Sequence, residues 1–215
     1  GVAELVEHRS HFVVGQQRRL ARGRPRHVQV VGDHGLRADE ARLRHVRGIE
    51  FLANNPRIHH ANIRIDATPA SRQLDDQDPA PGYDGIIVRS AVYPNGHFLG
   101  WTPGQAAPLL PKGLGWDLAP TSDLVIQLHL VPSGRPELIQ PSIGLYFTDD
   151  PPQQTPVMMR LSNQHIDIPA GDGNYVVTDA FILPTDVDVL AVQPHAHYLA
   201  REVTGIATLP DGTNY

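Results

Sequence analysis

Residues 123–131 read DLVIQLHLV, a strand-like pattern with a period of two. The even-numbered positions from 124 to 130 are all leucine or isoleucine, whereas the odd-numbered positions carry Val125, Gln127, His129 and Val131. Successive side chains of a β-strand point to opposite faces. We therefore expect a strand that packs its leucine and isoleucine side chains into a core and leaves His129 half exposed on the other face.

Similar short runs recur along the chain, namely ANIRID (61–66), GIIVRSAVY (85–93) and PSIGLYF (141–147). Turn-forming segments separate them, and the 215 residues include 20 prolines and 19 glycines. Many short strands joined by turns indicate an all-β fold rather than long helices. The pattern predicts an antiparallel, jelly-roll-like β-sandwich, with one complete domain and the start of a second.

Composition suggests three stretches. Residues 48–155 form the expected complete domain, and TDDPPQQTP (148–156) reads as a linker. Residues 156–215 read as the first strands of a second β-sandwich, which is cut short after the turn signal Pro210-Asp211-Gly212. Fewer strands follow the linker than a sandwich needs, so we expect this second domain to be truncated.

Residues 1–47 form a basic arm rich in arginine and histidine. They contain 10 of the 18 basic residues but only 5 of the 23 acidic ones, so the remainder of the chain is acidic. We expect the arm to be poorly ordered, with a short helix possible over residues 38–48. An acidic body argues against a nucleic-acid partner. No apolar run approaches the roughly 18 residues of a membrane helix.

Five histidines stand at strand positions: His59, His60, His129, His195 and His197. The chain has no cysteine, so a metal would be held by imidazole, carboxylate or thioether groups. His195 and His197 are two residues apart and would share one face of a strand, where two rings can bind one ion. The other seven histidines, at positions 8, 11, 27, 34, 45, 97 and 165, lack such a context and are expected to be solvated.

The doublet His59-His60 is harder to explain, because neighbours in a regular strand face opposite ways. Both rings can bind one ion only at a strand end or at a β-bulge. Pro56, which cannot donate to a strand ladder, supplies an irregularity just before the doublet. Taken singly, the doublet is better explained as a pair of surface histidines, and His129 as a half-exposed sheet residue.

Along the chain the histidine motifs come in the order His-His, Gln-x-His and His-x-His. This order is more specific for a function than any single motif. Together with their flanking residues, these motifs resemble the copper type II ascorbate-dependent monooxygenases, whose members include peptidylglycine α-hydroxylating monooxygenase, dopamine β-monooxygenase and bacterial relatives. The resemblance covers roughly residues 46–215. It rests on four stretches: IHHANIRID (58–66), GWTPGQAAPLLPKG (100–113), DLVIQLHLVPSGRPE (123–137) and AVQPHAHYLAREVTGIATLPDG (191–212).

The resemblance implies two jelly-roll-like domains, each with one copper. His59, His60 and His129 would hold the electron-transfer copper. His195 and His197 would be two ligands of the second copper, where O2 binds and a C–H bond of a small-molecule or peptide substrate is hydroxylated. Ascorbate would reduce both coppers, and the family suggests a secreted or periplasmic location.

The chain departs from the family pattern at three points. The family's methionine ligand of the second copper lies well downstream in the second domain, whereas Met158 and Met159 precede His195 and read as packing residues at a domain junction. Gln193 stands where the peptide-hydroxylating member has a substrate-binding arginine, which argues against a peptidylglycine substrate. The disulfides of the animal enzymes have no counterpart.

Two other functions fit some of the same residues. One is a β-sandwich that binds copper without catalysis. The other is a zinc hydrolase that uses His59, His60 and His129, since three histidines and a water form a known catalytic zinc arrangement. For the hydrolase no glutamate stands near as an obvious general base, and the nearest acidic residues after the doublet are Asp66, Asp75, Asp76 and Asp78.

Overall fold

The computed structural model describes residues 9–13, 18–19, 26–32, 43–79, 82–107, 109–136, 138–163, 165–196 and 200–215. The chain divides into two compact units, Gly1–Met159 and Arg160–Tyr215. The expected linker and domain boundary at residues 148–156 thus lie just before the division between the units.

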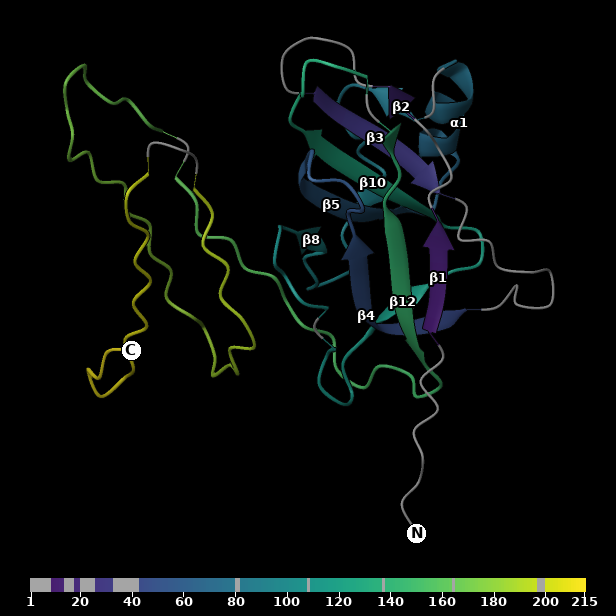
Figure 1. The fold of residues 1–215 in the computed structure, drawn as a ribbon. Helices are drawn as coiled ribbons and strands as arrows, with labels where there is room; N and C mark the ends of the chain where they lie inside the picture. Colours follow the sequence, from purple (N-terminus) through teal and green to yellow (C-terminus); the bar gives the residue numbers. More distant parts are fainter. Residues whose placement is uncertain are drawn as a thin grey trace. The chain divides into compact units, whose positions relative to one another are not determined.

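The first unit is built from antiparallel sheets (Figure 1). One sheet has the strand order β1-β12-β4-β9, and another has the order β6-β3-β10-β5-β7, with β8 also paired to β5. A third pairs β11 with β2. The strands are β1 (Arg9–Val13), β2 (Arg18–Arg19), β3 (Arg26–Gly32), β4 (Arg44–Leu52), β5 (Ile58–Asp66), β6 (Tyr83–Asp84), β7 (Ala91–Val92), β8 (Gly100–Trp101), β9 (Trp116–Leu118), β10 (Asp123–Leu130), β11 (Leu138–Ile139) and β12 (Ser142–Thr148).

The core lies between the two larger sheets. The strands confirm the all-β prediction. The jelly-roll connection stays a prediction. On β10 the even-numbered residues 124–130 are at most 3 % exposed, as their alternation predicts. They share one apolar cluster with Ile143 and Leu145 of β12 and with Trp116 and Leu118 of β9, in the other large sheet. Burial of side chains from both sheets in one cluster is what defines a β-sandwich.

The outer face of β10 is partly covered, which the strand pattern did not predict. Val125 is fully buried, because Ile87 and Ala91 pack against it in a second, smaller apolar cluster. The helix α1 (Ala70–Gln77) also lies against β3 and β10. One end of this face is therefore closed, whereas Gln127 and His129, toward the other end, stay half exposed.

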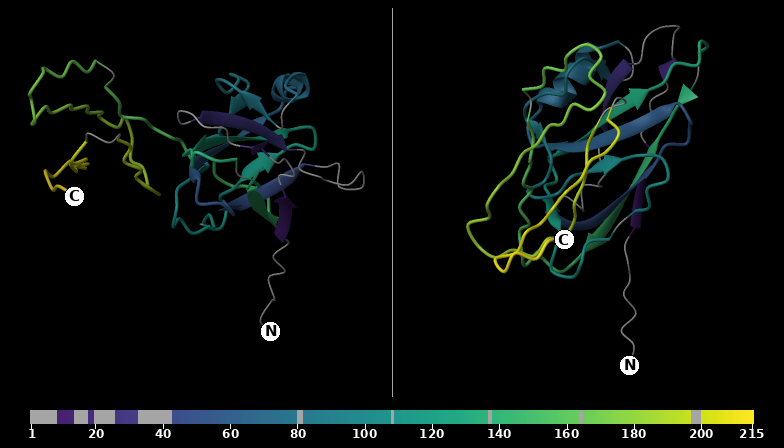
Figure 2. Two further views of the ribbon diagram at one scale, coloured as in Figure 1. Left: turned by 45° about the horizontal axis from the view of Figure 1, so that its top comes forward. Right: turned by 90° about the vertical axis from the view of Figure 1, so that its left-hand side faces the viewer.

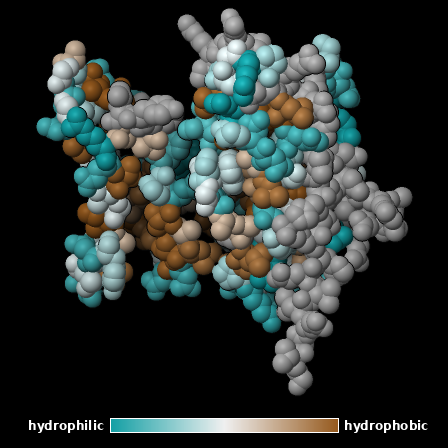
Figure 3. Space-filling model, in the orientation of Figure 1, coloured by the Kyte–Doolittle hydropathy of each residue, from teal (hydrophilic) through white to brown (hydrophobic). Residues whose placement is uncertain are grey.

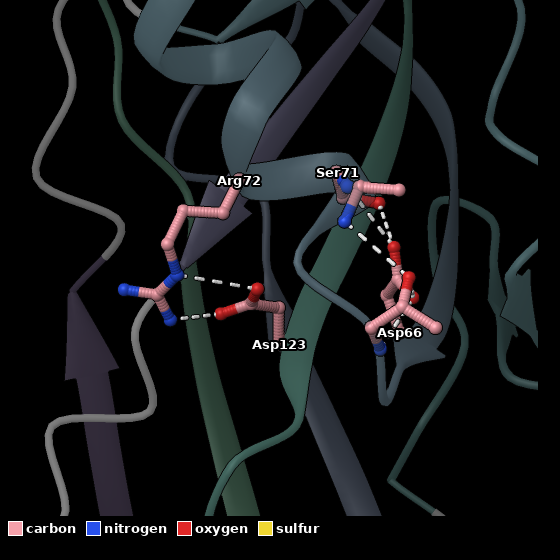
Figure 4. A network of polar contacts seen from close by, with 6 residues as sticks. Asp66, Ser71, Arg72 and Asp123 are labelled. Atoms are coloured by element: carbon pink, nitrogen blue, oxygen red, sulfur yellow. Dashed lines mark hydrogen bonds and ion pairs between the residues drawn. The ribbon is translucent and has the colours of Figure 1, made fainter.

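A buried carboxylate fastens the end of β5 to the start of α1 (Figure 4). Asp66 is fully buried and accepts hydrogen bonds from the backbone N–H and hydroxyl of Thr68 at 2.9 and 2.7 Å. It also accepts from the backbone N–H and hydroxyl of Ser71 at 3.0 and 2.6 Å and from the hydroxyl of Ser90 at 3.1 Å. Burial alone would raise the pKa of Asp66, but the hydrogen bonds from Ser71 and Thr68 outweigh it and hold this pKa below its ordinary value.

A second buried carboxylate starts β10. Asp123 is 1 % exposed and pairs with the guanidinium of Arg72 on α1 (Figure 4). A buried carboxylate needs such a partner, because removing its charge from water is costly. The pair joins α1 to the sheet at the end of β10 remote from His129.

Described parts of the basic arm form strands. β1 pairs with β12 over five residues, and β3 pairs with β10 over seven. Residues 44–48 belong to β4, so the helix suggested for residues 38–48 is wrong there. The stretch HVQVV (27–31) carries the alternation of a strand, which the high arginine and histidine content of the arm obscures.

The second unit shows little regular pairing in its described part. The described residues between 160 and 215 carry no strand arrow (Figures 1 and 2). They pair at one isolated bridge, Thr208 with Asn214. The predicted turn is present, since the N–H of Gly212 donates to the carbonyl of Leu209 at 2.9 Å and Gly212 has φ 87°. The strands expected in this unit are absent from its described residues.

Many apolar side chains of the second unit are exposed, among them Val176, Ile182 and Val192. Figure 3 shows such apolar residues on the surface of this segment. Among the described residues of the whole chain, none lies in a helix that is both long and apolar enough to cross a membrane.

Candidate metal centre

The histidine doublet lies on a β-bulge of β5. His60 is the partner of His129 on β10, and Ile58 is the partner of Leu130, so His59 is an extra residue without its own partner on β10. Such an insertion re-aims the side chains around it. Of the two irregularities that the sequence allowed, a strand end or a β-bulge, the structure has the bulge, and it falls at His59 itself rather than at Pro56.

The hydrophobic pattern keeps the bulge in place. Ile58 and Ala61, on either side of the doublet, are each 1 % exposed and belong to the core cluster. Beyond the bulge the N–H of Val131 donates to the carbonyl of Arg57 at 2.8 Å, so the strands stay paired. With both flanking residues fixed in the core, the two histidines between them share the outer side of the sheet.

Three imidazole rings converge at this point. The Nδ1 atoms of His59 and His60 are 3.1 Å apart, and those of His60 and His129 are 3.3 Å apart. One ring nitrogen from each residue lies within 4.8 Å of the other two. The rings meet edge to face, with centroids 4.6 to 5.3 Å apart. All three residues predicted for the first site are thus brought together.

The nitrogen spacing fits a metal ion. Metal–imidazole bonds of about 2.0–2.1 Å in tetrahedral geometry place two ligand nitrogens about 3.3 Å apart. The two Nδ1 separations of the cluster are close to that value. Without an ion, nitrogens at this distance need a proton between them, and a bound ion would replace those protons. The described residues therefore include a group that could hold a metal ion.

The residues around the histidine cluster support two of its rings and leave the third exposed to solvent. Asn62 and Gln127 are partners one rung further along the same two strands, and the Asn62 amide donates to the Gln127 side-chain oxygen at 3.3 Å. His60 and His129 are half buried, whereas His59 is exposed. The sequence pointed to Gln127 through its place before His129, but Asn62 is recognised only once the register is known.

No carboxylate joins the cluster among the described residues. Asp66 lies six residues from His60 along β5, about 20 Å away at the usual rise of a strand, and its oxygens are occupied by hydrogen bonds. Asp75 and Asp76 lie in α1, and Asp78 caps it. Asp66 is therefore too far away to act as a general base at the histidines, and none of the four acidic residues belongs to the histidine group.

The histidine pair expected for a second centre is described only in part. His195 is exposed in the second unit, and His197 lies outside the described residues. Met158 and Met159 are 44 % and 50 % exposed, and the packing role expected for them at a domain junction stays a prediction. The second metal site therefore stays a prediction.

His97 departs from the solvated state expected for it. It is 7 % exposed, and its Nε2–H donates to the carbonyl of Gly115 at 3.1 Å. Burial lowers the pKa of His97, and the hydrogen bond to Gly115 only partly opposes this effect. His45 also has a partner, since its Nδ1 lies 2.7 Å from a carboxylate oxygen of Asp117. Neither histidine belongs to the metal cluster.

Comparison with known proteins gives no family assignment. No protein-family model matches the chain, and no curated protein matches it. The resemblance to the copper monooxygenases therefore rests on the sequence motifs alone.

Proposed function

We propose that this chain binds copper through His59, His60 and His129, and that it belongs to a copper type II ascorbate-dependent monooxygenase that hydroxylates a C–H bond. The observation that carries the proposal is the convergence of three Nδ1 atoms at the bulge of β5. The order of the histidine motifs along the chain supports the choice of enzyme family.

Three imidazoles suit copper and zinc alike, so copper is proposed on the motif order rather than on the spacing of the nitrogens. Bound copper would supply one-electron chemistry by cycling between Cu(II) and Cu(I). The protein would hold the three nitrogens on two paired strands, with Ile58 and Ala61 fixed in the core beside them. Ligands held this rigidly move little when the charge of the ion changes.

The net reaction inserts one oxygen atom of O2 into a C–H bond and reduces the other to water. It consumes two electrons and two protons, and ascorbate would supply the electrons. In this proposal the centre at His59, His60 and His129 stores and passes on an electron. His195 and His197 would serve the second copper, where the substrate reacts.

The test begins with copper binding to the full chain. We expect wild-type protein to bind Cu(II) at His59, His60 and His129, and ascorbate to bleach its electron paramagnetic resonance signal. Ascorbate-dependent O2 consumption should exceed that of the His129→Ala variant at equal total copper, which controls for oxidation by loosely bound metal. Copper that is reduced without turnover would support the non-catalytic alternative. Retained zinc with hydrolytic activity would support the hydrolase and contradict the proposal.

A further inference from the structure

The outer side of the sheet continues beyond the metal centre with two amides and a cation. His60, Asn62 and Arg64 are alternate residues of β5, so their side chains lie on the same face. Asn62 is paired with Gln127 of β10 in the rung next to His60. Two residues of a strand span about 7 Å, so a molecule of that length could touch both the amides and the cation. Its nearer end would lie beside the metal centre.

Two aromatic rings, Tyr93 and Phe98, lie beside the same residues. Gly100 of β8 is the partner of Asn62, so a side chain at position 100 would point to the outer face. A Cβ there would come within 2.3 Å of the Phe98 ring, which therefore occupies this place next to Asn62. The centroids of the Phe98 and Tyr93 rings are 4.9 Å apart, and the guanidinium carbon of Arg64 lies 4.8 Å from the Tyr93 centroid.

Arg64 pairs with no carboxylate among the described residues. Its Nη1 donates to the carbonyl of Ala91 at 3.3 Å, and its Nε is buried without a hydrogen-bond partner. Because Arg64 is half buried, water screens its charge less than that of an exposed arginine. Asn62 donates one hydrogen bond to Gln127, which leaves the Oδ1 of Asn62 as an acceptor and the Nε2 of Gln127 as a donor. Phe98 is 42 % exposed, so a flat apolar ring adjoins these polar groups.

We propose that this surface binds the electron donor of the metal centre, a small planar enediol anion of the ascorbate class. Arg64 matches the charge of the anion. The amides of Asn62 and Gln127 match its hydroxyl groups, and the ring of Phe98 matches its flat face. The inference rests on the proposed copper site and deepens it. An electron donor fits this place better than the substrate, because the neighbouring centre is proposed to store electrons.

The reaction at this surface is a one-electron transfer. The enediol anion gives one electron, which reduces Cu(II) to Cu(I), and releases its remaining enediol proton to water. The product is a radical anion, which leaves the surface. Arg64 and the amides hold the donor on the outer side of the sheet next to His60, so the donor need not bind to the metal itself.

The first experiment measures binding of ascorbate to the full chain without copper and without O2, by titration calorimetry. We expect saturable binding to the wild type and a Kd about 10-fold higher in Arg64→Gln, because one charge-assisted hydrogen bond is lost. Arg89→Gln removes the same charge from an exposed residue of the same unit and should match the wild type. Phe98→Leu should weaken binding of ascorbate and of neutral hydroquinone, whereas Arg64→Gln should weaken binding of ascorbate alone.

The second experiment connects this surface to the metal centre. In the copper-loaded chain, the rate at which ascorbate bleaches the Cu(II) electron paramagnetic resonance signal should saturate with ascorbate concentration. Arg64→Gln should raise the half-saturating concentration about 10-fold and leave the amount of bound copper and the limiting rate unchanged. Arg89→Gln should again match the wild type.

The outcomes separate the two proposals. No saturable binding to the wild type, or equal Kd values in Arg64→Gln and Arg89→Gln, would overturn the donor-binding surface and leave the three-histidine site standing. Binding that depends on Arg64 in a chain that takes up no copper would contradict the proposed function and the role of the surface in electron transfer. Phe98→Leu tests the same surface if Arg64→Gln fails to fold.

Discussion

His60 lies directly opposite His129 on the neighbouring strand, and their Nδ1 atoms are 3.3 Å apart although the residues are 69 positions apart in the sequence. His59 completes the group because the bulge places it beside His60 on the outer side of the sheet. The centre therefore depends on one pairing register. A shift of one residue would turn His129 toward the core.

His129→Ala should abolish copper binding at this site and leave the fold intact. The residue is half exposed on the outer face, so we expect the free energy of unfolding to change by less than about 1 kcal/mol. Leu128→Ala, the matched control on the core face, should cost about 2–5 kcal/mol. Metal analysis and urea denaturation of the metal-free proteins measure the two effects. Unchanged copper content in His129→Ala would show that the site is elsewhere.

Copper should be released as the pH falls. Ligand imidazoles must be neutral, and protons compete with the metal below the ordinary histidine pKa of about 6.5. We expect bound copper, measured after dialysis at a series of pH values, to fall steeply between about pH 6.5 and 5. A copper content that stays constant down to pH 5 would argue against imidazole ligands.

Asp66→Asn should destabilise the first unit by about 3 kcal/mol, because a buried charged acceptor of hydrogen bonds from Thr68, Ser71 and Ser90 is lost. Its folded pKa is lowered, so the wild type keeps this stabilisation above the ordinary value of 3.8 and loses it as the pH falls through the folded pKa. Urea denaturation between pH 3 and 7 should show this loss in the wild type and a flatter profile in the variant.

Asp76→Asn provides the control for this prediction, since Asp76 is exposed on the same helix. We expect it to stay within about 0.5 kcal/mol of the wild type at neutral pH. If Asp66→Asn were no less stable than this control, the hydrogen bonds to Asp66 would not fasten α1 to β5.

His97 should make stability depend on pH in a higher range. Its folded pKa is lowered, so its contribution is complete above the ordinary value of 6.5 and is lost as the pH falls from there through the folded pKa. His97→Gln should flatten that slope and cost about 1–3 kcal/mol at pH 7.5, because the carbonyl of Gly115 loses its present donor. Metal-free protein should be used, so that copper release does not contribute. An equal slope in the variant would contradict this role.

The local alternation of residues 123–131 was enough to predict which side of β10 faces the core, because side-chain direction in a strand repeats every two residues. The same reasoning placed His59, His60 and His129 at strand positions and called for a strand end or a bulge at the doublet. Alternation also predicted strands in residues 160–215, where the described part has one bridge. A strand exists only when a partner pairs with it, and local pattern does not supply that partner.

The tertiary structure alone decided which residues contact one another. Register with distant strands placed His59 at the bulge, made Asn62 the neighbour of Gln127 and drew β1 and β3 of the basic arm into the sheets. The burial of Asp66, Val125 and His97 likewise depends on segments remote in sequence. The sequence determined which side chains alternate and which can bind a metal. Only packing of the whole sandwich decided their partners, because pairing register and burial are properties of several strands together.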